Sequence, residues 1–257
     1  MASCNYLWRS PLLKPVLGSN DVHIWKASLE QPAECMQLLT QILSHDEQKR
    51  SKRFYFQEDA RHFIACRGIL RAILGYYLGR EPQQLQFCYN YNGKPALGEN
   101  SEDRFLHFNL SHSQGLALYA VTSSREIGID LERIRNIPNF ERIAIRFFSP
   151  EEYTILHDLP ENQKNEVFFT YWTCKEAYVK ALGRGLSVPF SQFDVSIRKE
   201  ESVVLLNTKW NQEEGTRWYL HQLVPESNYV AAIAIESFSW RLYCWQWSSE
   251  TVSNIFR

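Results

Sequence analysis

The stretch Gly128-Ile129-Asp130-Leu131-Glu132 is an apolar run with two carboxylates two residues apart in this 257-residue chain. Its apolar residues predict a strand, and side chains along a strand point alternately to the two faces of a sheet. Asp130 and Glu132 therefore lie on one face, whereas Ile129 and Leu131 need burial on the other. Charged residues in strands usually lie on a solvated face. The pair alone thus leaves both a solvent-exposed face and a metal site open.

A second stretch, Trp172-Thr-Cys-Lys175-Glu176-Ala-Tyr-Val-Lys180, predicts a helix on which Glu176 and Lys180 are four residues apart and share one face. The pair could form an exposed salt-bridged surface, but the aromatic residues just before it indicate a packed helix. Three carboxylates with neighbouring lysines suit one hard cation and a phosphate group. The candidate metal ligands are Asp130, Glu132 and Glu176.

Composition narrows the function classes. Hydrophobic residues make up 44% of the chain and charged residues 22%, with a formal net charge of −1. A near-neutral chain has no overall field that favours nucleic acid. The six cysteines are scattered and none forms a C-x-x-C pair, which argues against a zinc site and for a reducing compartment. We expect no signal peptide, no membrane-spanning segment and a cytoplasmic protein.

The pattern along the chain is mixed α+β without regular βαβ alternation. Helices are expected from Ser44, from Glu58 to the stop at Gly79, and over 167–182. An edge strand is expected over 22–29. Further strands are expected over 116–121, 127–131, 203–207, 217–224, 229–235 and 240–247.

A faint internal duplication divides the chain. Cys66-Arg67 is followed by Leu74-Gly75, and Cys174-Lys175 is followed at the same interval by Leu182-Gly183. We therefore expect two halves, 1–124 and 125–257, which meet near residues 122–126, with a ligand between them.

Three further motifs are ambiguous on their own. Adjacent strand residues point apart, so Ser111 and His112 of Asn109-Leu-Ser111-His112-Ser113 do not form a nucleophile–base pair. His112 could donate to a phosphate or be an ordinary turn histidine. Gly93-Lys94-Pro95 reads as a turn. The basic residues around Arg50 could form a solvated face or hold a phosphomonoester.

Taken in order, these motifs resemble the 4′-phosphopantetheinyl transferases, in their larger, monomeric class, which activates peptide, polyketide and fatty-acid synthases. The matching blocks run from about Arg50 to Gly185. The resemblance implies two similar α+β subdomains in pseudo-twofold relation, each an antiparallel sheet packed on a long helix. It also implies a monomer with coenzyme A in the cleft between the subdomains.

The resemblance also implies roles for individual residues. Asp130, Glu132 and Glu176 match the Mg²⁺ ligands, a site that would also accept Mn²⁺, and Glu176 and Lys180 match catalytic positions. One departure is Glu47, which stands where some relatives carry a second basic residue near the 3′-phosphate of coenzyme A. The positions that match coenzyme A contacts are Arg50, Gly93, Lys94, Pro95, Ser111, His112, Lys175 and Lys180.

The implied reaction moves the 4′-phosphopantetheine arm of coenzyme A to a serine of an acyl, peptidyl or polyketide carrier protein and releases adenosine 3′,5′-bisphosphate. The motifs supply no covalent protein nucleophile, so direct transfer is the simpler hypothesis. A magnesium-dependent phosphohydrolase and a non-catalytic carrier-binding or nucleotide-binding module are the alternatives.

The segment from Ile134 to Phe148 is expected to dock the carrier. Arg135 and Arg142 would steer it, and Ile137 and Phe140 would make apolar contacts. Alternatively, Phe140 and Ile143 are ordinary core residues of a helix.

Overall fold

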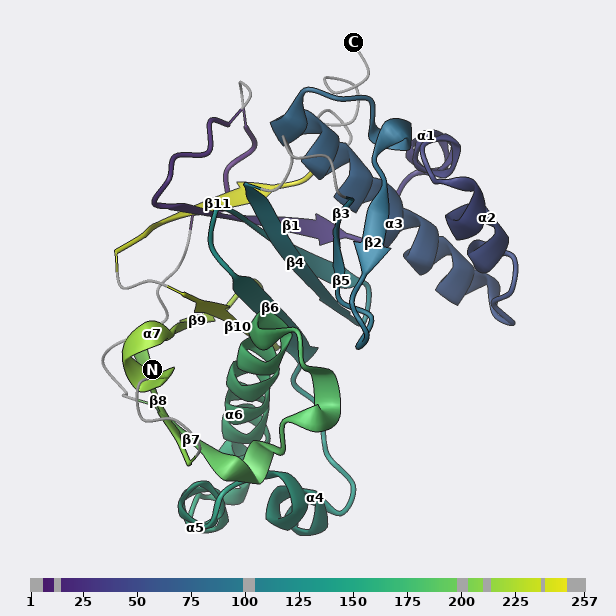
Figure 1. Ribbon diagram of the computed structural model, residues 1–257. Helices are drawn as coiled ribbons and strands as arrows, with labels where there is room; N and C mark the ends of the chain where they lie inside the picture. Colours follow the sequence, from purple (N-terminus) through teal and green to yellow (C-terminus); the bar gives the residue numbers. More distant parts are fainter. Residues whose placement is uncertain are drawn as a thin grey trace.

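The computed structural model describes residues 7–11, 15–98, 105–197, 203–209, 214–236 and 239–248, which form an α+β fold in two halves (Figure 1). The first half contains β1 (Asp21–Ser28), α1 (Ala33–Gln41), α2 (His45–Ser51), α3 (Gln57–Leu78), β2 (Phe87–Tyr89), β3 (Pro95–Leu97), β4 (Leu106–Ser113) and β5 (Leu116–Ser123). The rest of the chain forms β6 (Ile127–Arg133), α4 (Phe140–Phe147), α5 (Pro150–His157), α6 (Glu161–Leu182), β7 (Phe193–Ile197), β8 (Val203–Thr208), α7 (Glu214–Arg217), β9 (Tyr219–Leu223), β10 (Tyr229–Ile235) and β11 (Arg241–Gln246).

Two sheets and two long helices form the layers of the fold. The sheets have the strand orders β11-β1-β5-β4 and β6-β10-β9-β8-β7. One apolar core lies between α3 and the first sheet, another between α6 and the second, and a third between the two sheets. Strands such as β5 are therefore apolar on both faces: Tyr119 packs in the core under α3, and Leu118 packs between the sheets.

Both long helices end as the sequence predicts. Gly79 ends α3 and Gly183 ends α6, each in the left-handed conformation, with φ of 65° and 64°. Glycine adopts this conformation without the steric cost that a side chain would add. The start of α6 is six residues earlier than expected, at Glu161, because its first turns are polar and carry no apolar periodicity.

The position of β1 corrects the expectation of an edge strand. It lies between β5 and β11 and is buried along nearly its whole length. Its alternation with polar residues is misleading because those residues are buried with partners. His23 is 2.7 Å from the Tyr77 hydroxyl, and Lys26 is 3.1 Å from Glu226.

The pairing of β1 with β11 is parallel, so the first sheet is not wholly antiparallel. A division of the chain at residues 124/125 would also assign β11 to the second half, although this strand lies in the sheet of the first half. Strand β11 thus returns the chain to the half in which it began.

The edge strands β4 and β6 join the halves through side chains. Alternate side-chain oxygens of β4 accept hydrogen bonds from backbone N–H groups of β6, which satisfies donors that an edge strand leaves unpaired. The bonds are Ile129 N to Asn109 Oδ1 at 2.9 Å, Leu131 N to Ser111 Oγ at 3.2 Å and Arg133 N to Ser113 Oγ at 3.3 Å. We call this set of contacts the β4–β6 ladder.

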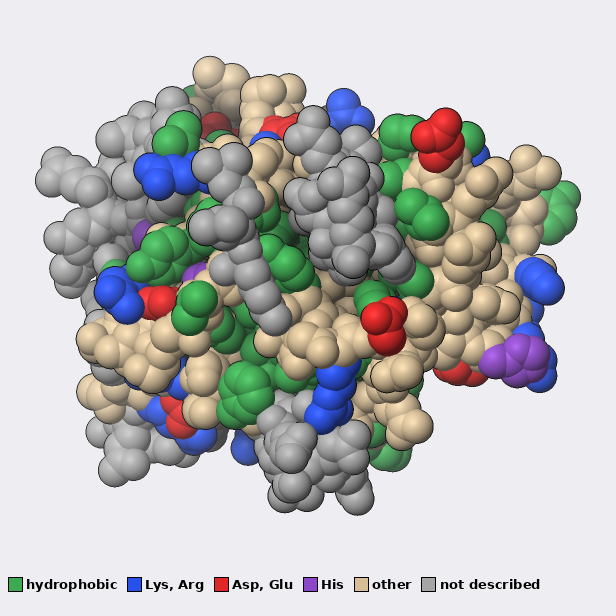
Figure 2. Space-filling model, turned by 90° about the horizontal axis from the view of Figure 1, so that it is seen from above, with side chains coloured by type: hydrophobic (Ala, Val, Ile, Leu, Met, Phe, Trp, Pro, Cys, Tyr) green, Lys and Arg blue, Asp and Glu red, His purple; other side chains and the backbone are tan. Residues whose placement is uncertain are grey.

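The surface carries charges of both signs. On the face seen in Figure 2, basic and acidic side chains are interspersed among apolar ones and do not gather in a patch of one sign. Among the described residues, no helix combines the length and apolar character needed to cross a bilayer.

Candidate active site

A cleft of about 1280 Å³ opens between the halves. This volume exceeds the roughly 300–1,000 Å³ of typical small-molecule pockets, so the cleft has room for a large ligand. The first half contributes residues of α2, α3 and β4 to its walls, and the second contributes residues of β6 and α6. Its polar lining includes Arg50, Glu58, His62, Arg67, Tyr89, Ser111, His112, Asp130, Glu132, Glu176 and Lys180.

Gly128 explains how β6 and α6 bring their carboxylates together. A Cβ atom at this position would lie 2.0 Å from the carbonyl oxygen of Ala177 and 2.4 Å from the backbone nitrogen of Ala181. Only glycine allows so close an approach of strand to helix. Asp130, two residues on, and Glu176 consequently both face the cleft.

Asp130 is the most enclosed of the three predicted metal ligands. Its Oδ1 atom is 2.6 Å from the ammonium of Lys180 and accepts a hydrogen bond from Ser111 Oγ at 2.9 Å. Its Oδ2 atom is buried and accepts no hydrogen bond from the described part of the chain. A buried carboxylate oxygen in this state lacks the partner that its charge requires.

Excess negative charge marks the same place. Burial, followed by the charges of Asp130 and Glu132, raises the pKa of Glu176 to about 7, although Lys180 acts to lower it. The three carboxylates thus outnumber their cationic partners, which are Lys180 beside Asp130 and Arg135 beside Glu132. Oxygen donors with a surplus of negative charge fit a hard divalent cation such as Mg²⁺.

A second group of potential metal ligands lies in the same cleft. In the described residues, the ligand atoms of Glu30, Glu58 and His62 lie within 4.8 Å of one another, and those of the three predicted metal ligands are not so close.

Lys175 corrects a prediction. Its side chain is fully buried, 2.8 Å from Glu152, and donates to the carbonyl oxygens of Phe190 and Phe193 at 2.7 and 2.5 Å. It therefore lies in the core between α5, α6 and β7 and is not among the residues that line the cleft. Burial lowers the pKa of Lys175 and raises that of Glu152, so desolvation opposes a pair that the two charges favour.

Lys94 also has a different place from the one expected. Gly93 and Pro95 line the cleft as predicted. The Lys94 ammonium instead donates to Glu126 at 2.9 Å and to the Ala181 carbonyl oxygen at 3.0 Å. Lys94 thus braces the β2–β3 hairpin against the end of α6.

The first half lines the cleft with basic groups that include Arg50 and His112, and with the carboxylates of Glu30, Glu58 and Asp59. Arg50 is exposed, with its guanidinium 5.2 Å from the centre of the Phe63 ring. His112 faces the cleft from β4, and partial burial, followed by the charges of Lys180 and His62, lowers its pKa. Both side chains line the same cleft as the three carboxylates.

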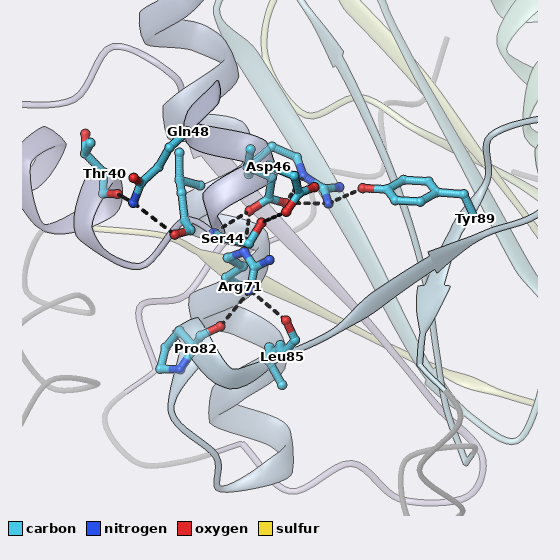
Figure 3. A network of polar contacts seen from close by, with 11 residues as sticks. Thr40, Ser44, Asp46, Gln48, Arg71, Pro82, Leu85 and Tyr89 are labelled. Carbon is cyan, nitrogen blue, oxygen red and sulfur yellow. Dashed lines mark hydrogen bonds and ion pairs between the residues drawn. The ribbon is translucent and has the colours of Figure 1, made fainter. Parts of the chain in front are cut away.

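Glu47 belongs to a polar network that also includes Ser44 and Arg71, which Figure 3 labels. Its carboxylate caps α2 and accepts from Arg67 Nε at 2.8 Å and from Arg71 Nε at 2.5 Å. Burial alone would raise the pKa of Glu47, but the two guanidiniums outweigh it and lower the pKa. A carboxylate so engaged does not reach the cleft, which explains why an acid is tolerated where some relatives carry a base.

Sequence reasoning missed Arg67 and Tyr89, which both line the cleft. Arg67 donates to the Tyr89 hydroxyl at 2.9 Å and is otherwise held by Glu47. The signal in the sequence was the Cys66-Arg67 pair of the internal duplication. Because this pair lies in an apolar helical pattern, the sequence did not indicate that Arg67 would line a cleft.

Comparison with known proteins agrees with this architecture. Residues 24–124 match the family model of the 4′-phosphopantetheinyl transferase N-terminal region, and residues 126–234 match that of the 4′-phosphopantetheinyl transferase superfamily. The chain is 46% identical over 231 residues to 4′-phosphopantetheinyl transferase HetI of Nostoc sp., which covers 90% of this chain and 94% of that protein.

The chain belongs to the 4′-phosphopantetheinyl transferase family. Two further relatives of this transferase are the enzymes gsp of Aneurinibacillus migulanus, 31% identical over 72% of this chain and 73% of that protein, and Sfp of Bacillus subtilis, 30% identical over 63% and 70%. The predicted family, its larger class and its enzyme type are confirmed. The transferase moves the 4′-phosphopantetheine group of coenzyme A to a serine of a carrier protein.

Proposed function

We propose that the cleft is the active site of this transfer and that Asp130, Glu132 and Glu176 hold Mg²⁺ or Mn²⁺ in it. The observation that carries the proposal is that carboxylates and basic groups meet in one cleft. The second half presents three carboxylates and Lys180, and the first presents Arg50, Arg67 and His112 together with the carboxylates of Glu30, Glu58 and Asp59. Coenzyme A carries a pyrophosphate, which suits a metal site, and a separate 3′-phosphate, which suits a second group of cations.

Each residue of the metal wall has a role in this proposal. The bound ion would neutralise pyrophosphate charge. Lys180, whose side chain is 30% exposed, offers its N–H groups to phosphate oxygens and stabilises the negative charge that develops on the leaving group. Glu176, on the cleft wall, accepts the proton of the carrier serine.

The transfer itself is direct. The serine oxygen forms a bond to the phosphorus that bears the pantetheine arm, and the bond from that phosphorus to adenosine 3′,5′-bisphosphate breaks. Arg50, Ser111 and His112 bind the nucleotide in the meantime, with the cations on the 3′-phosphate.

The acceptor is an acyl, peptidyl or polyketide carrier protein, and we propose that it docks near α4. Arg142 and Ile145 are exposed there, Ile145 at 63%. Ile137, Phe140 and Ile143 pack partly into the core of the second half, as the alternative in the sequence analysis foresaw for Phe140 and Ile143. Exposed apolar and basic side chains suit a docking surface for an acidic partner.

We further propose a cytoplasmic monomer. Both walls of the cleft come from one chain, so a second copy is not needed to complete it. The cysteines Cys35, Cys66, Cys88, Cys174 and Cys244 are free thiols, which suits a reducing compartment.

One experiment separates the proposal from its alternatives. The protein is incubated with coenzyme A, Mg²⁺ and an apo carrier protein, and the carrier is measured by intact mass spectrometry. A gain of one phosphopantetheine on the serine, lost in Glu176→Gln, is the expected result. Release of phosphopantetheine without a carrier would indicate a phosphohydrolase. Carrier binding without any covalent change would indicate a binding module.

A further inference from the structure

The β4–β6 ladder does more at two of its three positions than join the halves. Ser111 accepts from Leu131 N and donates to Asp130 Oδ1 at 2.9 Å. Two residues along, Ser113 accepts from Arg133 N and donates to Glu132 Oε2 at 3.0 Å. Each serine hydroxyl therefore joins a carboxylate to the backbone N–H of the next residue.

The repeat follows from strand geometry. On β4, residues two apart both face β6, and on β6, residues two apart both carry a carboxylate. The contact made at one position is therefore made again two residues further along. A serine hydroxyl has one donor hydrogen and two acceptor lone pairs. Since the backbone N–H fixes the position of the oxygen, the hydroxyl hydrogen can be directed at the carboxylate.

We propose that Ser113 is a positioning residue that orients Glu132 toward the metal, as Ser111 does for Asp130. This inference rests on the proposed metal site. Glu132 needs such a restraint because its other contact is Arg135, at 3.2 Å, on a side chain that is 52% exposed. A mobile surface arginine orients a carboxylate weakly, whereas groups that hold metal ligands typically change metal affinity about 10–100-fold when they are removed.

Asn109 supplies a matched control within the same ladder. Its Oδ1 atom accepts from Ile129 N at 2.9 Å, as the serines accept from their own partners. The preceding residue on β6 is Gly128, which has no carboxylate to orient. Loss of Asn109 thus breaks one contact between the halves and leaves both carboxylate contacts in place.

The test measures Mn²⁺ affinity of the full chain by electron paramagnetic resonance, with coenzyme A present and no carrier protein. We expect Ser113→Ala to raise the Kd for Mn²⁺ about tenfold. Ser113→Thr keeps the hydroxyl and should stay close to wild type. Asn109→Ala should lower the thermal midpoint and leave the Kd unchanged. In a Glu132→Gln background, Ser113→Ala should cause no further loss, because the residue through which Ser113 acts has been changed.

Each other result overturns the role of Ser113. An unchanged Kd in Ser113→Ala, or an equal loss in Asn109→Ala, would make the ladder purely structural. A wild-type protein that binds no Mn²⁺ would refute the proposed metal site itself, which is a distinguishable failure. Ser113→Cys keeps the size of serine with much weaker hydrogen bonds and gives the same answer if Ser113→Ala does not fold. In turnover, the loss should appear in the KM for Mg²⁺ more than in kcat.

Discussion

The two halves of the molecule share one construction and use it differently. In each, a capping box begins a short helix, α2 or α5, and its glutamate is buried against the long helix that follows. Glu47 pairs with Arg67 on α3, and Glu152 pairs with Lys175 on α6. Both basic residues directly follow the cysteine of the duplicated pattern. The pair is thus a structural element of each half.

The halves differ at the next positions along the long helices. Counted from Cys66, α3 has Gly68 where α6, counted from Cys174, has Glu176. A Cβ atom at Gly68 would lie 2.8 Å from the Cβ atom of Leu39 on α1, so this part of α3 is used for packing. Glu176 instead faces the cleft. The two halves thus show that this position of the long helix can carry an acidic residue facing the cleft where no neighbouring helix covers it.

Removal of the acidic residues of the second half should have the largest effect on activity. Asp130→Asn and Glu176→Gln should each lower kcat/KM for carrier by about 10²–10⁴-fold, because a metal ligand is lost and, at Glu176, also a proton acceptor. Thermal midpoints should stay near wild type. Steady-state kinetics at saturating Mg²⁺ provide the measurement, and near-normal turnover in either variant would refute the site.

The two lysines of α6 allow a second test. Lys175→Met should lower the free energy of unfolding by about 3–5 kcal/mol, because Glu152 would remain buried without its partner. Lys180→Met should change stability by less than about 1 kcal/mol, since its side chain is partly exposed, but should reduce turnover. Urea denaturation and kinetics separate the two effects. A stable Lys175→Met variant with weakened coenzyme A binding would restore the role predicted from sequence.

The proposed roles of Arg50 and His112 can be tested with two ligands. Arg50→Ala and His112→Ala should each weaken the binding of coenzyme A by about 1.5–3 kcal/mol, which is the free energy of a charge-assisted hydrogen bond. Binding of 3′-dephospho-coenzyme A should change much less. Isothermal titration calorimetry with both ligands gives the ratio of the two affinities. An equal loss of affinity for the two ligands would show that these residues do not recognise the 3′-phosphate.

Substitution of Arg142 tests whether the carrier protein docks on the second half. Arg142→Glu should raise the KM for an acidic carrier, with an effect of about 0.2–1 kcal/mol that shrinks as salt is added. Coenzyme A affinity should not change. Arg135 is unsuitable for this test because it contacts Glu132. An unaltered KM at low salt would exclude docking at α4.

The ion pair and hydrogen bond that join the halves at Glu126 allow a test by pH. A hydrogen bond with His107, partly offset by burial and reinforced by Lys94, lowers the pKa of Glu126 from 4.5 to about 2. A lowered pKa means that the unfolded chain binds the proton more readily, so the stabilisation is present above pH 4.5 and is lost as pH falls toward 2. The difference in unfolding free energy between wild type and Glu126→Gln should shrink over that range in pH-dependent urea titrations. A difference in unfolding free energy that stays constant over this pH range would contradict the lowered pKa of Glu126.

Much of the secondary structure could be predicted because its causes are local. Gly79 and Gly183 end the long helices, and the strands at the end of the chain, β8 to β11, lie where their apolar alternation places them. The same local geometry put Asp130 and Glu132 on one face of β6. Glycine conformation, strand alternation and helix spacing depend on residues that are close in sequence.

Which of those residues line the cleft depends on the tertiary structure. Lys175 and Glu176 are neighbours on α6, yet one lies in the core and the other in the cleft. Their directions are set by what packs on each side of the helix, namely α5 and β7 on one side and β6 on the other. The central place of β1, the burial of Glu47 and the contact of Lys94 with Glu126 have the same origin. The surroundings of a side chain come from segments far away in sequence, which local patterns do not specify.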